Sequence, residues 1–195
     1  TLMRPSAGGG ANWAGAGLDP ETGFLYVPSR NRHTVKRFRE PHQGEAATLR
    51  YIEARRRGMG PQMPDGLPLW KPPYSRITAI DMNTGEHVWM QPLGEGNDVR
   101  RHPMLAHLDL PPLGGNRLAG PLVTKTLLIG ALEDGGTDGG PRLTARDKAS
   151  GEIVASVDLP AGAMGTPMTY LLDGKQYLAL TIAGELPELI ALRLP

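Results

Sequence analysis

Five histidines are the side chains of this sequence with the most direct capacity for metal or proton chemistry, because the chain has no cysteine. They are His33, His42, His87, His102 and His107. Their spacing shows no metal-binding pattern, which favours surface or turn roles. The triple glycine at 8–10 precedes a predicted strand rather than a helix, so it does not indicate a phosphate-binding loop.

The adjacent pair Asn12 and Trp13 is the stronger candidate for contact with a ligand. The Asn12 amide can donate and accept hydrogen bonds, and the Trp13 indole offers a large flat apolar face. The alternative is that Asn12 caps a turn and Trp13 belongs to the core. Met164 and Gly165 form a weaker candidate, because small residues at that point can simply let neighbouring sheets approach each other.

Short strands must position these residues, and the clearest strand pair runs from Arg76 to Pro92. Apolar and polar side chains alternate on both sides of a turn, which is the period of a strand. Asp81 and Asn83 can hydrogen-bond the local backbone, and Gly85 can adopt positive φ without a steric clash. This stretch therefore predicts a hairpin, with Trp89 packed against a neighbouring sheet.

The composition indicates an all-β protein. The chain has 26 Gly, 19 Pro and 39% hydrophobic residues, which suits many short strands joined by turns. A net charge of +1 gives no reason to expect nucleic acid as a partner. No apolar run approaches the roughly 20 residues of a membrane-spanning helix. Because the chain opens directly into strand-like sequence, we expect it to be the C-terminal piece of a longer protein.

The predicted turns repeat along the chain. Turns between first and second strands centre on Glu21, Lys125 and Gly174, and the last two are 49 residues apart, near the period of four-stranded propeller blades. Turns between third and fourth strands centre on Asn83 and Ala149. The extra length within the first unit predicts that residues 31–74 are an insertion between its second and third strands.

These spacings predict a β-propeller of four-stranded antiparallel blades. The chain, 1–195, is then part of a single domain with two complete blades and three strands of a third. In the insertion, an arginine-rich stretch favours a solvated face, and 45–57 predicts a short helix. Open sheet edges are expected, especially near Leu127–Leu132. The units are a blade at 10–92 with the insertion 31–74, a blade at 118–160 and a partial blade at 165–195.

The pattern Ala79-x-Asp81-x-x-Thr84-Gly85-x-x-x-Trp89 resembles the tryptophan-docking motif of quinoprotein dehydrogenases, which use pyrroloquinoline quinone (PQQ). Further stretches resemble the same family, especially its membrane-associated glucose and quinate dehydrogenase branch, and occur in the family's order. They are Gly10-Ala-Asn-Trp-Ala-Gly15, His102-Pro103 with Leu108-Asp-Leu-Pro-Pro-Leu-Gly114, Gly120-Pro-Leu-Val-Thr124, and Gly162-Ala-Met-Gly-Thr-Pro-Met-Thr-Tyr170.

The resemblance implies an eight-bladed propeller that holds PQQ and Ca²⁺ near its axis. It implies oxidation of a sugar, polyol or alcohol hydroxyl, with electrons passed to a quinone or a cytochrome. The catalytic base and the calcium ligands are expected upstream of this chain, so no residue here is assigned either role. A periplasmic location is implied, with any inner-membrane anchor also upstream.

The cofactor contacts expected in this chain are Asn12, Trp13, Met164 and Gly165. In a propeller, the loops that lead into each first strand line the axial channel, and both pairs occupy such loops. The competing hypothesis is a non-catalytic propeller that binds proteins, similar to an outer-membrane assembly lipoprotein. Asn12 and Trp13 favour the enzyme, because a scaffold requires neither.

Overall fold

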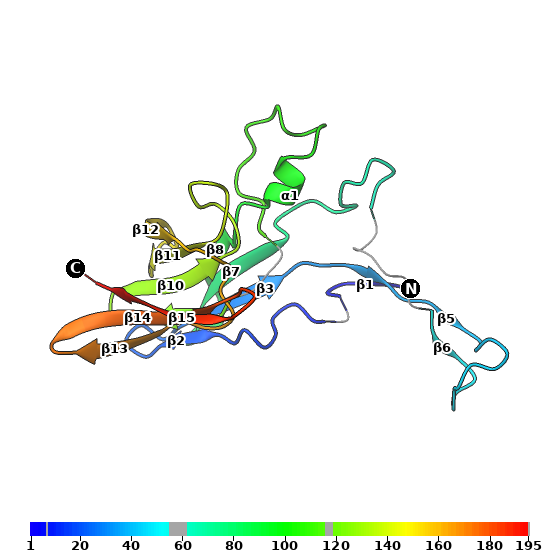
Figure 1. Ribbon diagram of the computed structural model, residues 1–195, viewed down its shortest axis with the longest axis horizontal. Coiled ribbons are helices and arrows are strands. Elements are labelled where there is room, and N and C mark those ends of the chain that lie inside the picture. Colours follow the sequence, from blue (N-terminus) through cyan, green and yellow to red (C-terminus); the bar gives the residue numbers. More distant parts are fainter. Residues whose placement is uncertain (7, 55–61, 116–118, 195) are drawn as a thin grey trace.

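The computed structural model describes residues 1–6, 8–54, 62–115 and 119–194, and its body consists of three antiparallel sheets (Figure 1). The first sheet has the order β2-β3-β7-β8, with β2 at Gly17–Asp19, β3 at Phe24–Arg30, β7 at Ser75–Asp81 and β8 at His87–Pro92. The second has the order β12-β11-β10-β9, with β9 at Leu122–Val123, β10 at Leu127–Leu132, β11 at Arg142–Asp147 and β12 at Ile153–Asp158. The third contains β13 at Met168–Leu172, β14 at Lys175–Ile182 and β15 at Glu188–Arg193.

Each sheet is a meander in which consecutive strands pair, so the all-β, antiparallel prediction is confirmed. Tight turns contain the glycines that the sequence placed there. Gly85 and Gly151 have φ of 78° and 74°, values that are costly for residues with a Cβ. Local turn chemistry therefore sets the register of β7 with β8 and of β11 with β12.

Two apolar clusters hold neighbouring sheets together. In the first cluster, Tyr26, Ile77 and Ala79 of the first sheet pack with Leu128 and Leu132 of the second. The second cluster joins the second sheet to the third in the same manner. Its buried members are Ile129, Ala131, Leu143, Leu159, Leu178 and Leu180. Sheets therefore stack face to face, with β-branched and leucine side chains between them.

Residues 31–74 leave the first sheet and return to it. The ladder of β3 with β7 runs to the pair Arg30 and Ser75, so the two strands are direct neighbours. The intervening segment takes part in two short strand pairs, one of them with the N-terminal residues, in an arm that extends away from the sheets (Figure 1). These pairs are β1, Leu2–Met3, with β4, Thr34–Val35, and β5, Phe38–Arg39, with β6, Ile52–Glu53.

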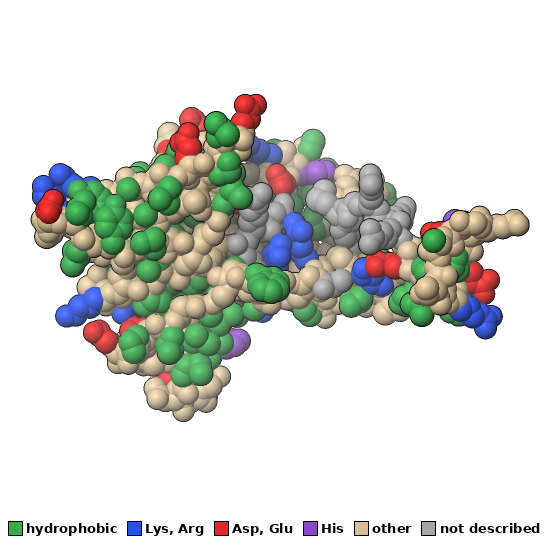
Figure 2. All heavy atoms as spheres, turned by 60° about the horizontal axis from the view of Figure 1, so that its bottom comes forward, with side chains coloured by type: hydrophobic (Ala, Val, Ile, Leu, Met, Phe, Trp, Pro, Cys, Tyr) green, Lys and Arg blue, Asp and Glu red, His purple; other side chains and the backbone are tan. Residues whose placement is uncertain are grey.

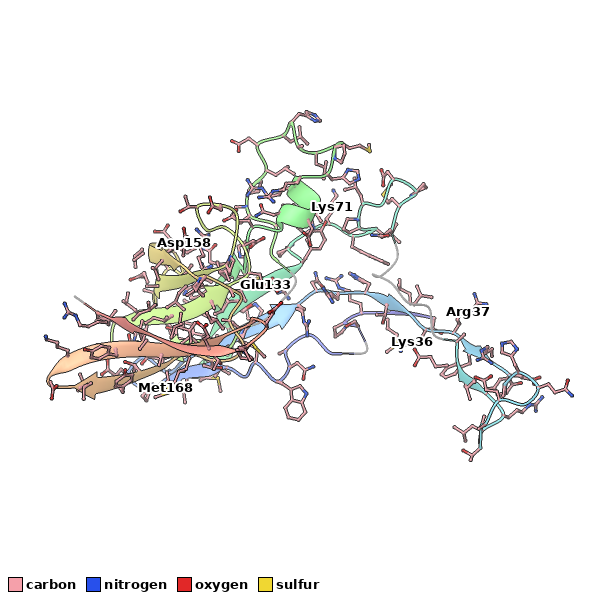
Figure 3. All side chains as sticks on the ribbon, in the orientation of Figure 1. Lys36, Arg37, Lys71, Glu133, Asp158 and Met168 are labelled. Atoms are coloured by element: carbon pink, nitrogen blue, oxygen red, sulfur yellow. The ribbon has the colours of Figure 1, made fainter. Side chains whose placement is uncertain are left out.

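The helix expected at 45–57 is not formed in its described part, 45–54. Arg39 donates two hydrogen bonds to the Glu45 carboxylate, at 2.7 and 2.8 Å, and Ile52 pairs with Arg39 in β6. Between β5 and β6 the chain reverses through an irregular loop with bends at 48–50, and a helix over 45–54 would break both contacts. Figure 3 shows Lys36 and Arg37 projecting from this arm, and Lys36 forms an ion pair with Glu53. Residues 55–57 lie outside the described part of the chain.

A short helix occurs instead in the segment between the first two sheets. This helix, α1, spans Asn97–Arg100. Asp134 accepts hydrogen bonds from the backbone N–H groups of Glu95 and Gly96, at 2.7 and 2.8 Å, and of Asn97, at 3.2 Å. A carboxylate from the second sheet thus holds the start of the helix in place.

The expected open edge lies elsewhere than the sequence suggested. β10, which contains Leu127–Leu132, pairs with β9 and β11 and lies inside its sheet. The apolar run at this strand reflects burial between sheets, not an edge. In the described structure, β15 pairs only with β14, and Leu189 on this strand is 71% exposed. Exposed hydrophobic side chains are also visible over the body of the molecule in Figure 2.

Candidate functional site

The predicted site residues lie at one end of the sheets. Because all strands are antiparallel, successive connections alternate between two ends. The long segments 31–74, 93–121 and 159–167 share one end, whereas the opposite end carries tight turns. Asn12 and Trp13 precede β2, Ala119 and Gly120 precede β9, and Met164 and Gly165 precede β13. Each predicted pair therefore leads into the first strand of a sheet.

Gly120 is the point at which these three leading segments meet. It is buried, and a Cβ placed on it would clash with the backbone oxygen of Ala14 and with the Oγ1 of Thr166. Ala14 follows Trp13 directly, and Thr166 follows Gly165. The structure therefore brings the predicted segments into contact through a residue that must lack a side chain.

The first strands of the first two sheets are also in close contact. A Cβ on Gly17 of β2 would lie 2.5 Å from Cγ2 of Val123 in β9. A side chain at Gly17 would therefore collide with the Val123 side chain, so the close packing of these two strands favours glycine at this position. The two sheets are thus nearest along these first strands, which is the geometry expected around a propeller axis.

The Asn12 side chain organises its own loop. Its Nδ2 donates to the Gly8 carbonyl at 2.5 Å, and its Oδ1 accepts from the Trp13 backbone N–H at 2.9 Å. The Gly15 N–H closes the turn on the Asn12 carbonyl at 2.9 Å. An amide nitrogen has two protons, and the bond to Gly8 engages one of them. Asn12 therefore does cap a turn, and its amide keeps donor capacity.

Trp13 does not belong to the core of this chain, which corrects the alternative considered from the sequence. Its side chain is 98% exposed. The backbone of this loop is fixed by Asn12, so the indole is held outward by an ordered turn. An ordered, exposed indole is a surface suited to stacking against a flat ligand or to packing against another part of the protein.

Met164 and Gly165 are anchored to the third sheet. The Met164 N–H donates to the Thr181 carbonyl at 2.8 Å, and the Thr181 hydroxyl donates to the Met164 carbonyl at 3.3 Å. Ala163 forms a bridge with Ile182. Gly165 has a φ of 149°, which favours glycine. The Met164 side chain is 55% exposed, so it is available to a ligand or a neighbouring element.

A charged network beside the site was missed from the sequence. Glu95 accepts hydrogen bonds from Arg100 at 2.6 Å and from Arg142 at 3.0 Å, and so joins the α1 segment to β11. Gly94 and Gly96, which flank Glu95, both have positive φ. In the sequence, this pair of glycines could have indicated a turn at Glu95.

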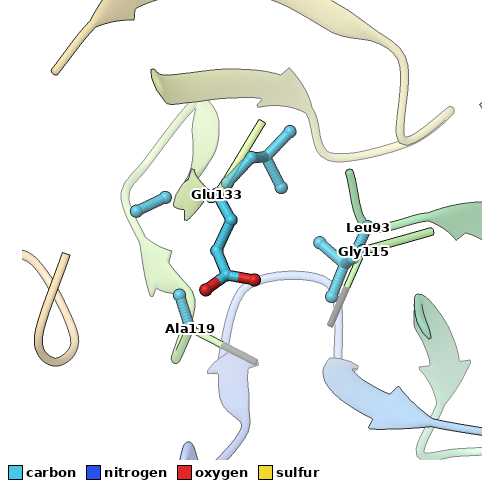
Figure 4. Close-up of a pocket in the computed structure, with 6 residues that line it drawn as sticks. Leu93, Gly115, Ala119 and Glu133 are labelled. Carbon is cyan, nitrogen blue, oxygen red and sulfur yellow. The ribbon is translucent and has the colours of Figure 1, made fainter. Parts of the chain in front are cut away.

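A separate cavity of about 10 Å³, enough for one water molecule, lies between the segment that follows β8 and the end of β10 (Figure 4). Its lining includes Leu93, Gly115 and Ala119, and the Glu133 side chain extends toward it in Figure 4.

Trp89 joins the first sheet to the tight turn of the second. Its indole N–H donates to the Lys148 carbonyl at 3.0 Å. Its ring covers Gly151 so closely that a Cβ there would lie 2.6 Å from Cε3. The Tyr26 hydroxyl donates to the same Lys148 carbonyl at 3.2 Å, and burial raises the pKa of Tyr26 to about 12. This tyrosine therefore remains a neutral donor at every physiological pH.

Lys148 also places its ammonium group in the first sheet. It lies 2.6 Å from the Asp19 carboxylate, and both side chains are largely buried. Asp19 accepts further hydrogen bonds from the Thr22 hydroxyl at 2.8 Å and the Glu21 N–H at 3.1 Å. The hydrogen bond from Lys148 is the main cause that holds the Asp19 pKa below its ordinary value, against the effect of burial. A single turn residue thus bonds the neighbouring sheet through both its side chain and its backbone.

Replacement of Asp134 by alanine is expected to destabilise the α1 segment. Three backbone N–H groups lose their acceptor, and the expected cost is about 1–3 kcal/mol in the free energy of unfolding. Hydrogen–deuterium exchange should show faster exchange at 95–97, and Asp138→Ala, an exposed position in the same loop, provides the control. Equal protection of 95–97 in both variants would contradict this role for Asp134.

Three stacked antiparallel meanders, with the first strands of the first two in contact and the leading segments of all three at one end, define a run of β-propeller blades. The chain belongs to the family of PQQ-type glucose, ethanol and alcohol dehydrogenase β-propeller domains, whose model matches residues 1–178. The propeller fold expected from the sequence is thereby confirmed.

Curated relatives agree with this assignment. The chain is 28% identical to quinate/shikimate dehydrogenase (quinone) of Acinetobacter baylyi over 205 residues, covering 94% of this chain and 24% of the relative. It is 35% identical to quinoprotein glucose dehydrogenase of Escherichia coli over 124 residues, covering 63% and 15%. The chain thus spans about a quarter or less of the length of these relatives.

A solved structure shares the fold. The quinohemoprotein alcohol dehydrogenase of Pseudomonas putida HK5 superposes with a TM-score of 0.62 at 20% identity, covering 94% of this chain and 24% of that one. At this identity the similarity concerns the fold alone. Within the described ranges, no helix has the length and apolar character needed to cross a bilayer.

Proposed function

We propose that residues 1–195 form the C-terminal part of a single propeller domain in a PQQ-dependent dehydrogenase. The observation that supports this most is the convergence of the leading segments on Gly120 in a chain of this family. Two of these segments carry the pairs Asn12–Trp13 and Met164–Gly165. The proposed blades are 10–92 with the insertion 31–74, 118–160 and the partial blade 165–195.

The residues at this face fit a flat, polar, aromatic cofactor. Trp13 offers an exposed indole on an ordered loop, and Asn12 keeps an amide proton for a carbonyl or carboxylate oxygen. Gly165 brings backbone close to the same face without a side chain. When bound, PQQ would supply the two-electron acceptor for oxidation of a hydroxyl group. Asn12, Trp13, Met164 and Gly165 would bind and orient it.

Among the described residues, no group of three or more His, Cys, Asp or Glu side chains is arranged to bind a metal ion. On the family resemblance, we propose that the Ca²⁺ ligands and the catalytic base lie in parts of the protein outside this chain.

The substrate is proposed to be a sugar, polyol or alcohol, with a quinone or cytochrome as electron acceptor. The relatives include a quinate/shikimate dehydrogenase (quinone) and a quinoprotein glucose dehydrogenase, which motivates this choice. We also propose a periplasmic location, and a tryptophan-docking role for the contact of Trp89 with Gly151. The family match and these dehydrogenase relatives favour an enzyme over a protein-binding scaffold.

Titration with PQQ tests the site. In the protein that carries this chain, Trp13→Ala is expected to weaken PQQ binding, while its melting temperature changes little because the side chain is exposed. Asn12→Ala should cost about 1–3 kcal/mol in PQQ binding, roughly 5- to 150-fold in Kd.

Phe38→Ala is the matched control, since this aromatic side chain is 73% exposed on the arm, away from the leading segments. Its PQQ affinity should equal that of the wild type. If Trp13→Ala and Phe38→Ala bind PQQ equally well, Trp13 does not contact the cofactor and the proposed site is wrong.

A further inference from the structure

The two ends of the insertion 31–74 are joined by a pair of stacked rings. His33 near its start and Trp70 near its end have ring centroids 3.8 Å apart and planes inclined by only 9°. Beneath them, the Asn31 N–H donates to the Tyr74 carbonyl at 2.8 Å. The stack and this hydrogen bond together close the base of the insertion.

His33 is enclosed in a setting that accommodates a neutral ring better than a cation. Its side chain is 9% exposed, and its Nε2 is buried without a hydrogen-bond partner in the described structure. The same is true of the neighbouring Thr34 hydroxyl. Arg4 is the charged group that acts on the ring from the N-terminal segment, where its Nε donates to Asn31 Oδ1 at 2.9 Å. A second positive charge at His33 would face this guanidinium.

We propose that the His33–Trp70 stack is a pH-sensitive clasp, which closes the base of the insertion when His33 is neutral and opens when His33 takes up a proton. Protonation would place an unpaired cation in a buried position beside Arg4, which is costly unless the ring moves to water. The clasp stands on the geometry of this chain alone and does not require the proposed enzyme function.

The direction of the pH dependence follows from the two states. In the closed clasp, burial and then Arg4 lower the pKa of His33 below its ordinary value of 6.5. In the open state the ring is hydrated, and its pKa returns to about 6.5. The open state therefore binds a proton more readily. The clasp is fully stable above about pH 6.5, and each unit below it favours opening by up to tenfold until the closed-state pKa is reached.

Backbone hydrogen bonds connect the base of the insertion to the candidate cofactor site, so opening of the clasp would affect that site. The Arg30 N–H donates to the Gly10 carbonyl at 2.9 Å, and Gly10 lies two residues before Asn12. On the other side, the Tyr74 N–H donates to the Leu113 carbonyl at 2.8 Å, in the segment that leads toward the second sheet. The base of the insertion thus connects two of the long segments at the same end of the sheets.

Hydrogen–deuterium exchange of the intact protein between pH 5 and 8, corrected for intrinsic exchange, tests this proposal. In the wild type, the opening constant of amides in 30–35 and 70–74 should rise up to tenfold per pH unit below about 6.5. His33→Gln should remove this dependence. His42→Gln, an exposed position on the arm, should retain it. Wild-type opening that is independent of pH, or equal dependence in His33→Gln, would overturn the clasp.

His33→Gln could also abolish the pH dependence by destabilising the base of the insertion, so a second measurement uses the wild-type histidine. NMR titration of labelled histidines in the wild type should give His33 a pKa below 6.5, and Trp70→Leu, which removes the stack, should raise it toward 6.5. A wild-type His33 that titrates at 6.5 or above would exclude the proposal without any substitution of the histidine itself.

Discussion

Replacement of Trp89 by alanine is expected to lower the free energy of unfolding by about 3–5 kcal/mol, the range for a large aromatic residue packed in a core. The ring packs in the cluster that contains Tyr26 and Leu128, and it covers Gly151 of the next sheet. The substitution also removes the hydrogen bond from the indole N–H to the Lys148 carbonyl. The loss therefore separates two sheets as well as creating a cavity. Thermal or denaturant unfolding of the intact protein measures the effect.

Trp13→Ala is the control for this prediction, because it removes the same side chain from a position that is 98% exposed. We expect the two variants to separate stability from cofactor affinity. Trp89→Ala should melt earlier, and its folded fraction should bind PQQ almost as the wild type does. An early melt of Trp13→Ala together with a loss of PQQ affinity in Trp89→Ala would show that the two tryptophans have the opposite roles.

Loss of the Asp19 carboxylate is the second large effect. Asp19→Ala leaves the Lys148 ammonium in a mostly buried position without its counter-charge, and the expected cost is about 3–5 kcal/mol. Lys148→Met removes the cation and keeps much of the side-chain volume. The double variant should be less destabilised than the sum of the single ones, because neither charge remains alone. Strict additivity in a double-mutant cycle would contradict direct coupling of the two groups.

The same pair predicts a dependence on acid. The pKa of Asp19 in the folded protein lies below its ordinary value of 3.8, mainly because Lys148 donates to it. The folded state thus holds this proton less readily than the unfolded state. The stabilisation is complete above about pH 4 and is lost as the pH falls through the folded-state pKa. The stability difference between wild type and Asp19→Ala should therefore shrink in strong acid.

Much of the fold could be predicted because it depends on local chemistry. The turns at Asp81–Gly85 and Asp147–Gly151 close by bonds within the turns themselves, as in the Asp81 carboxylate accepting the Asn83 N–H at 2.8 Å. Alternation along the strands identifies which faces are apolar. These signals need no knowledge of distant residues, and the structure has hairpins at both places.

Contacts between distant residues could not be predicted in the same manner. Lys148 and Asp19 are 129 positions apart, and neither stands out in the sequence from other surface charges. The helix predicted at 45–57 is wrong over 45–54, because the conformation there depends on the pairing of β6 with β5 and on the Arg39–Glu45 ion pair, not on residue preferences. Tertiary contacts overrode a weak local tendency in this segment.

The candidate site shows both situations. Its placement at one end of the sheets follows from strand alternation, which the sequence reveals. The hydrogen bond of Asn12 to Gly8 and the meeting of Ala14, Gly120 and Thr166 depend on how three loops fold against one another. At Gly120 only glycine fits between these loops, but in the sequence this position cannot be told apart from the other glycines of a chain that has 26 of them.

The closed base of residues 31–74 has a practical consequence for protein engineering. Arg30 and Ser75 are paired in one ladder, and the Asn31 N–H meets the Tyr74 carbonyl at 2.8 Å, so the two polypeptide ends at this point are neighbours. A guest domain whose own termini lie close together, such as a fluorescent reporter, could replace residues 35–69 without separating β3 from β7. Because the Arg30 N–H donates to the Gly10 carbonyl, such a fusion would place the reporter at the end of the sheets that carries the Asn12–Trp13 loop.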